Sequence, residues 1–69
     1  MRMTPDHRDM LIRINEFNLT EVTPTPVMLV RGLSGKDRAK AYRILSDLER
    51  HRFIRNTSST LYGKEYLVA

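Results

Sequence analysis

The segment from Ser34 to Arg55 constrains the fold most strongly, because it reads as one long amphipathic helix. The apolar residues Ala41, Ile44, Leu45 and Leu48 recur at spacings of three and four, which places them on one helix face. At about 100° per residue, the opposite face carries Lys36, Ala39, Arg43, Ser46 and Arg50. Ser34 with Asp37 three positions on resembles a capping box at the helix start. The pattern predicts a helix over about residues 35–51 with a buried aliphatic side and an exposed cationic side.

The positive charge of the chain is concentrated in residues 31–55. Eight Lys and Arg against three acidic residues give this segment +5, whereas the whole chain carries +4. Residues 1–30 sum to −1 and residues 56–69 are neutral. A small scaffold with its cations gathered on one segment favours a polyanion as partner.

The length of 69 residues predicts one domain, residues 1–69, with a modest core. The chain has no Cys, so neither a disulfide nor a thiolate zinc site is possible, which fits a reducing compartment. No apolar run approaches the ~18 residues needed to cross a bilayer, and no signal peptide is visible. We therefore expect no membrane association and a cytoplasmic location.

Two further helices are predicted before this segment. Thr4-Pro5-Asp6 is typical of a helix start, and a helical stripe follows over about residues 5–17, consisting of Met10, Leu11, Ile14 and Phe17. Thr25-Pro26 repeats the start signal and predicts a helix over about residues 26–33 that buries Val27, Val30 and Leu33. The Thr-rich stretch between the two suits an extended segment or a short edge strand, because Pro24 has no amide hydrogen to donate.

The C-terminal region predicts a β-hairpin over about residues 53–68. Phe53-Ile54 begins a strand, a polar tip follows at residues 56–60, and the return strand alternates at Tyr62, Lys64, Tyr66 and Val68. The expected fold class is therefore α+β, mostly α, with three helices and a C-terminal hairpin.

This arrangement resembles a winged helix-turn-helix domain from Pro5 to Val68. The most specific likeness is the end of the recognition helix, where Leu48-Glu49 and Phe53-Ile54-Arg55 match the family pattern. Arg52 occupies the position where the family usually has Gly. The resemblance implies that the helix over residues 35–51 enters the major groove of DNA, while the hairpin, or wing, lies on the backbone or in the minor groove.

Arg43 is the first candidate for a groove contact, because Arg can pair with guanine in two hydrogen bonds. Its structural alternative is a solvated ion pair with Asp47 at i+4. The predicted DNA-binding residues are Lys36, Arg38, Ala39, Lys40, Tyr42, Arg43, Arg55 and Lys64. Arg50 and Arg52 suit the negative end of the helix dipole and are interpreted as structural.

The expected function is double-stranded DNA binding, as a small transcriptional regulator or an accessory factor of a mobile element. The alternatives are a winged-helix protein-interaction module, which exposed Ile12 and Leu19 would favour, and binding of structured RNA. A homodimer, through the first helix, the Thr-rich segment or a sheet edge, or cooperative assembly on DNA would complete the site. No enzyme motif is present, and we expect no catalytic residue, cofactor or small-molecule ligand. His7 and His51 belong to no ligand-spaced cluster, so no metal is expected.

Overall fold

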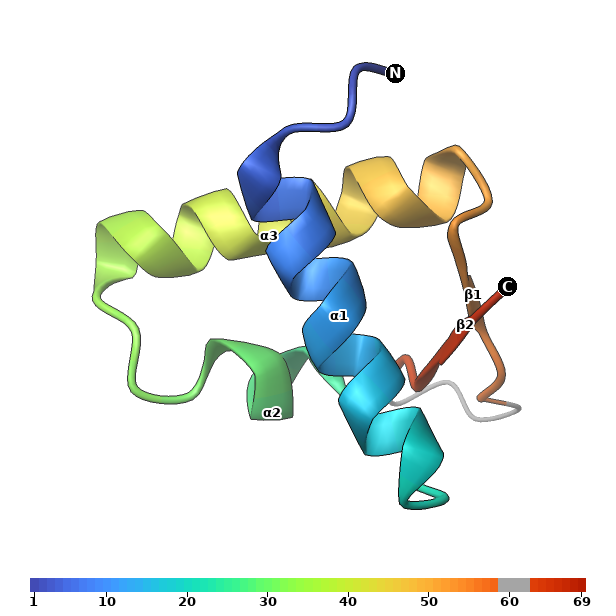
Figure 1. The fold of residues 1–69 in the computed structure, drawn as a ribbon. Helices are drawn as coiled ribbons and strands as arrows, with labels where there is room; N and C mark the ends of the chain where they lie inside the picture. The colour runs from blue at the N-terminus through green and yellow to red at the C-terminus, as the bar shows by residue number, and fades with distance from the viewer. Residues whose placement is uncertain (59–62) are drawn as a thin grey trace.

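Three helices and one antiparallel pair of strands make up the regular structure that the computed structural model describes over residues 1–58 and 63–69 (Figure 1). The elements are α1 (Pro5–Leu19), α2 (Pro26–Val30), α3 (Gly35–Arg50), β1 (Ile54–Asn56) and β2 (Tyr66–Val68). The expected class, mostly helical α+β with a C-terminal hairpin, is confirmed. No helix among the described residues is long and apolar enough to cross a membrane.

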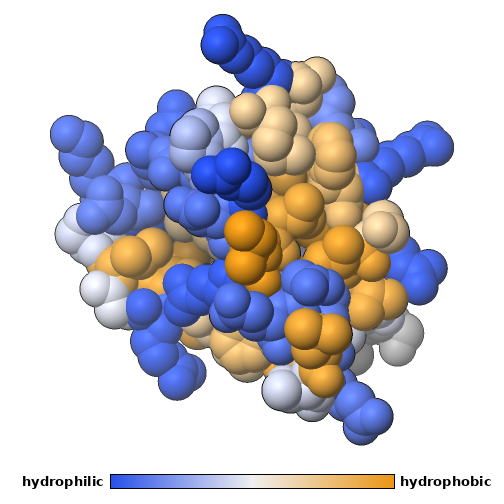
Figure 2. Space-filling model, viewed as in Figure 1, coloured by the Kyte–Doolittle hydropathy of each residue, from blue (hydrophilic) through white to orange (hydrophobic). Residues whose placement is uncertain are grey.

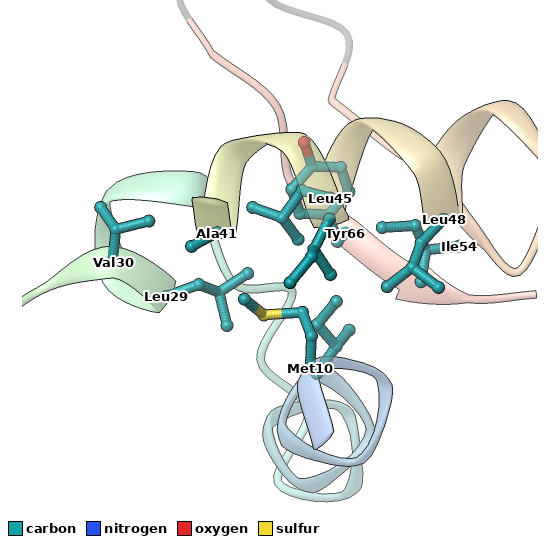
Figure 3. Packing of buried hydrophobic residues seen from close by; sticks show 10 residues of the cluster. Met10, Leu29, Val30, Ala41, Leu45, Leu48, Ile54 and Tyr66 are labelled. Carbon is teal, nitrogen blue, oxygen red and sulfur yellow. The ribbon is translucent and has the colours of Figure 1, made fainter. Parts of the chain in front are cut away.

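The core lies where α1 crosses α3, with α2 and the hairpin closing its other sides (Figure 1). Figure 3 shows side chains from all these elements converging on it. Its buried members are Met10, Ile14, Leu29, Val30, Ala41, Ile44, Leu45, Leu48, Ile54 and Tyr66. The four residues of the stripe predicted on α3 are all buried, which confirms that interpretation.

The helix starts follow the predicted capping chemistry. The hydroxyls of Thr4, Thr25 and Ser34 each accept a hydrogen bond from a backbone amide in the first turn of the helix that follows. A hydroxyl in this position satisfies one of the amides that a helix start leaves without a partner. Asp37 returns the contact, because its carboxylate accepts from the Ser34 hydroxyl at 3.3 Å.

Both long helices end in the same left-handed turn without using glycine. Glu21 after α1 and Arg52 after α3 have φ values of 62° and 65°. The amide of the next residue returns to the helix in each case, from Val22 to the Phe17 carbonyl and from Phe53 to the Leu48 carbonyl. This is the Schellman arrangement, which usually has Gly at the left-handed position. Arg52 therefore adopts the conformation of the glycine that it replaces in the family pattern.

The second helix is shorter than predicted, and the three residues expected in the core differ in burial: Val30 is buried, Leu33 is partly buried against the core, and Val27 is exposed. The helix ends at Val30, because Arg31 is extended and Gly32 has a φ of 85°. Val27 was expected in the core but is 61% exposed, whereas Leu29 is fully buried. A helix of five residues carries too few turns for periodicity to identify its buried side.

The hairpin is joined to α1 by Asn18, which the first helix includes because α1 continues to Leu19. The Asn18 side chain donates to the carbonyls of Val22 and Tyr66 and accepts from the Val68 amide. It thereby pairs with β2 much as a backbone residue of a third strand would. The Thr-rich segment adds one backbone bond, from the Tyr66 amide to the Pro24 carbonyl, but it forms no strand.

The strands pair in the register Ile54 with Val68, Arg55 with Leu67, and Asn56 with Tyr66. One further backbone bond, from the Thr57 amide to the Glu65 carbonyl at 2.8 Å, continues the pairing toward the tip. Of the four alternating residues predicted for the return strand, Tyr66 and Val68 lie in β2 and Lys64 precedes it. Tyr62 lies outside the described residues.

Candidate nucleic-acid interface

The outer side of α3 is a continuous exposed surface with a cationic character. Its members are the predicted Lys36, Ala39, Arg43, Ser46 and Arg50, all of them exposed. The helix presents them because its opposite side is held in the core by Leu45 and Leu48, which are at most 1% exposed. We call these five residues the α3 outer face.

Arg43 lies at the centre of the α3 outer face. The predicted ion pair with Asp47 is absent, because the Asp47 carboxylate is held by His7 at 3.0 Å and by Arg50 at 2.9 Å. Within the described part of the chain, neither Arg43 nor Lys36 forms a salt bridge. Their charges are thus available to a ligand without loss of an internal pair.

Lys40 lies toward α1 and is engaged in the free protein. Its ammonium contacts the Asp6 carboxylate at 2.7 Å, and this contact raises the pKa of Lys40 above its usual value. Both side chains are more than half exposed, and pairs in such surroundings are weak because water and salt screen them. A phosphate could replace Asp6 at this position with little loss.

Arg38 and Tyr42 lie on the other flank of α3. Arg38 donates to the Leu33 carbonyl at 3.4 Å, which closes the turn before the helix. Tyr42 is 43% exposed. The neighbouring Tyr66 is buried, and its pKa is raised to about 12, mainly by burial and further by the charges of Glu49 and Tyr42. The phenol of Tyr66 therefore stays neutral.

The hairpin region carries Arg55 and Lys64, which differ in their contacts. Arg55 is exposed on β1 and has no salt bridge among the described residues. Lys64 contacts Glu49 of α3 at 2.7 Å, so it ties the hairpin to the helix. Of the eight predicted residues, Lys36, Ala39 and Arg43 lie together on the α3 outer face, and Lys40 and Lys64 are engaged by carboxylates. Arg38 and Tyr42 lie on a flank of α3, and Arg55 is exposed on β1.

The hydrogen bonds that His7 makes to Asp47 of α3 and to Thr4 were not predicted from the sequence. His7 is buried, and its Nε2 donates to Asp47 Oδ2 at 3.0 Å, while its Nδ1 accepts from the Thr4 amide at 3.4 Å. The hydrogen bond from His7 is the main cause that lowers the pKa of Asp47 below its usual value. Burial opposes this shift by raising the pKa, and the positive charge of Arg50 adds to the lowering. The one local signal was His7 at the third helical position after Thr4, where a capping box usually has Glu.

No group of three His, Asp or Glu side chains capable of holding a metal ion occurs in residues 1–58 and 63–69. The His7–Asp47 pair joins α1 to α3. No known family model matches the chain, and no curated protein or solved structure is significantly similar to it.

Proposed function

We propose that the protein binds double-stranded DNA as a winged helix-turn-helix domain, with α3 in the major groove and the hairpin on the backbone. The observation that carries the proposal is the α3 outer face, where Lys36 and Arg43 are exposed and form no salt bridge within residues 1–58 and 63–69. An α-helix fits the major groove, and Arg can read guanine there. A regulator of transcription or an accessory factor of a mobile element is the role we infer.

The small side chains of Ala39 and Ser46 support this mode of docking. Both are exposed on the same face as Arg43, so the helix backbone could approach base edges closely. Lys40 and Lys64 would exchange Asp6 and Glu49 for phosphates on binding, as positioning contacts that carry no sequence information.

Fluorescence anisotropy with random duplexes, and with duplexes selected for binding, tests the proposal. Affinity should fall linearly with the logarithm of salt concentration, because phosphate contacts release counterions. Absence of binding at low salt, or binding indifferent to salt, would overturn it.

Two substitutions separate the groove from the backbone. Arg43→Ala should weaken binding to a selected site by about 1–3 kcal/mol and flatten the preference over random DNA. Lys64→Ala should weaken binding to both duplexes equally, and it should lower the slope of log affinity against log salt concentration by about 1. Asn15→Asp makes the same one-unit change in net charge on the exposed side of α1, and it should have little effect on either duplex.

A second candidate function is docking onto an acidic protein partner. Exposed Ile12 and Leu19, at 49% and 75%, favour a protein contact on α1. Pull-down from the native host after nuclease treatment distinguishes the two: a retained partner that requires Arg43 would favour the protein over DNA.

A further inference from the structure

The exposed side of α1 has a chemistry different from that of α3. Arg8, Ile12, Glu16 and Leu19 follow one another at spacings of four, four and three, so they share one helix face, and all four are exposed. Figure 2, viewed from the side of α1, shows apolar side chains between long hydrophilic ones over this helix. We call these four residues the α1 outer face.

Within the part of the chain that the structure describes, no contact explains why these four side chains occur together on one exposed face. Arg8 and Glu16 form no salt bridge there. Leu19 is 75% exposed, the highest value among the large apolar residues that the structure describes. Isolated exposed apolar residues are ordinary, so the distinctive property of this face is the placement of its two charged residues on either side of Ile12.

We propose that two copies of the chain associate through antiparallel α1 helices, with the two-fold axis passing Ile12. Ile12 is the middle residue of α1, Pro5–Leu19. In an antiparallel pair centred there, each residue faces the one equally far on the other side of Ile12. Arg8 of one copy therefore meets the partner's Glu16, and symmetry repeats the contact.

The apolar residues obey the same register. Ile12 meets its own copy at the axis, and Leu19 meets the partner's Pro5, beside the exposed Met3 of that chain. A parallel pair would instead place Arg8 against Arg8 and Glu16 against Glu16, which is repulsive. The charge pattern thus selects both the second copy as occupant and the antiparallel orientation.

This association uses a surface separate from the proposed DNA site. Figure 1 shows α1 crossing α3. The two helices share one core through their buried residues, and the residues of both outer faces are exposed outside that core. The α3 outer face stays uncovered in each copy. One helix of about 22 Å buries less than the 1,200–2,000 Å² of a standard stable interface, so self-association is expected at high protein concentration.

Sedimentation equilibrium of the full chain without DNA tests the proposal. The apparent mass should rise toward twice the monomer mass with concentration. Arg8→Glu or Glu16→Arg alone should keep the protein monomeric at the same concentrations, and the double variant should restore association, because the charges are then exchanged on both copies.

Arg31→Glu is the matched control for Arg8→Glu, since it makes the same charge change at an exposed position outside α1 and should leave association intact. Circular dichroism should show each variant folded. A wild-type chain that stays monomeric at every concentration, or single reversals without effect, would overturn the proposal, as would a double variant that remains monomeric. DNA affinity measured separately distinguishes this failure from failure of the proposed function.

Discussion

The two long helices are built by the same local rules and differ in what they expose. Each begins at a hydroxyl cap and ends in a left-handed turn at a non-glycine residue. Each also buries an aliphatic stripe in the shared core. The α3 outer face is cationic, whereas the α1 outer face is apolar at Ile12 and Leu19 with one charge of each sign. Capping and apolar periodicity establish both helices, and the exposed residues that these signals do not determine give the two helices different outer faces.

The largest effect should come from the buried side of α3. Leu48 is fully buried, so Leu48→Ala should lower the free energy of unfolding by about 2–5 kcal/mol through lost burial and a cavity. For a chain this small, that is a large share of the total. Arg43→Ala, on the outer side of the same helix, should change it by less than about 0.5 kcal/mol. Urea unfolding measures both, and equal losses would contradict the two-faced interpretation of α3.

The next effect concerns the attachment of the hairpin to α1. Asn18→Ala removes three hydrogen bonds and leaves the Tyr66 carbonyl and the Val68 amide without this partner, at a cost of about 1–3 kcal/mol. Amide hydrogen exchange at Val68 should accelerate. Asn15→Ala on the exposed side of α1 is the control, and equal stability of the two variants would mean that Asn18 does not hold the wing.

The left-handed turns should respond in the opposite direction. Glu21→Gly and Arg52→Gly relieve an unfavourable φ at the ends of α1 and α3, and each should raise the free energy of unfolding by about 0.5–1 kcal/mol. Thermal unfolding measures the gain. A loss of stability would show that contacts of the Glu21 or Arg52 side chain outweigh the backbone strain.

The smallest effect is the pH dependence of the α1–α3 contact. The pKa of Asp47 lies below its ordinary value of 3.8, chiefly because His7 donates to the carboxylate. The stabilisation that ionised Asp47 gives the folded state is therefore complete above the pKa that Asp47 has in the unfolded chain. It is lost as pH falls through the lower pKa that Asp47 has in the folded protein. Melting temperatures measured from neutral pH to pH 2 should fall less steeply for Asp47→Asn than for the wild type. Parallel curves would mean that this carboxylate does not contribute.

Much of the fold could be predicted because its signals are local. The stripe on α3 and the three hydroxyl caps depend on residues within four positions of each other, and the structure confirms them. Exposure of Lys36 and Arg43 follows from the same periodicity. The short α2 was misread at Val27, since five residues cannot define a face.

The ion-pair partners of the charged side chains could not be predicted from local sequence patterns. Lys40 meets Asp6, and Lys64 meets Glu49, but nothing in the neighbouring residues specifies either choice. The same holds for Asn18 and β2, which lie about 50 residues apart in the chain.

Local periodicity and capping chemistry establish where the helices begin, which sides are aliphatic and where the positive charge gathers, because these depend on backbone geometry within a few residues. Tertiary packing decides which of the cations are neutralised and which carboxylate receives His7, because hydrogen bonds and ion pairs require proximity in space. The crossing of α1 over α3 supplies that proximity for His7, which reaches Asp47 from α1, whereas Arg50 reaches Asp47 from the same helix. Among the residues that the structure describes, Arg43 forms no salt bridge.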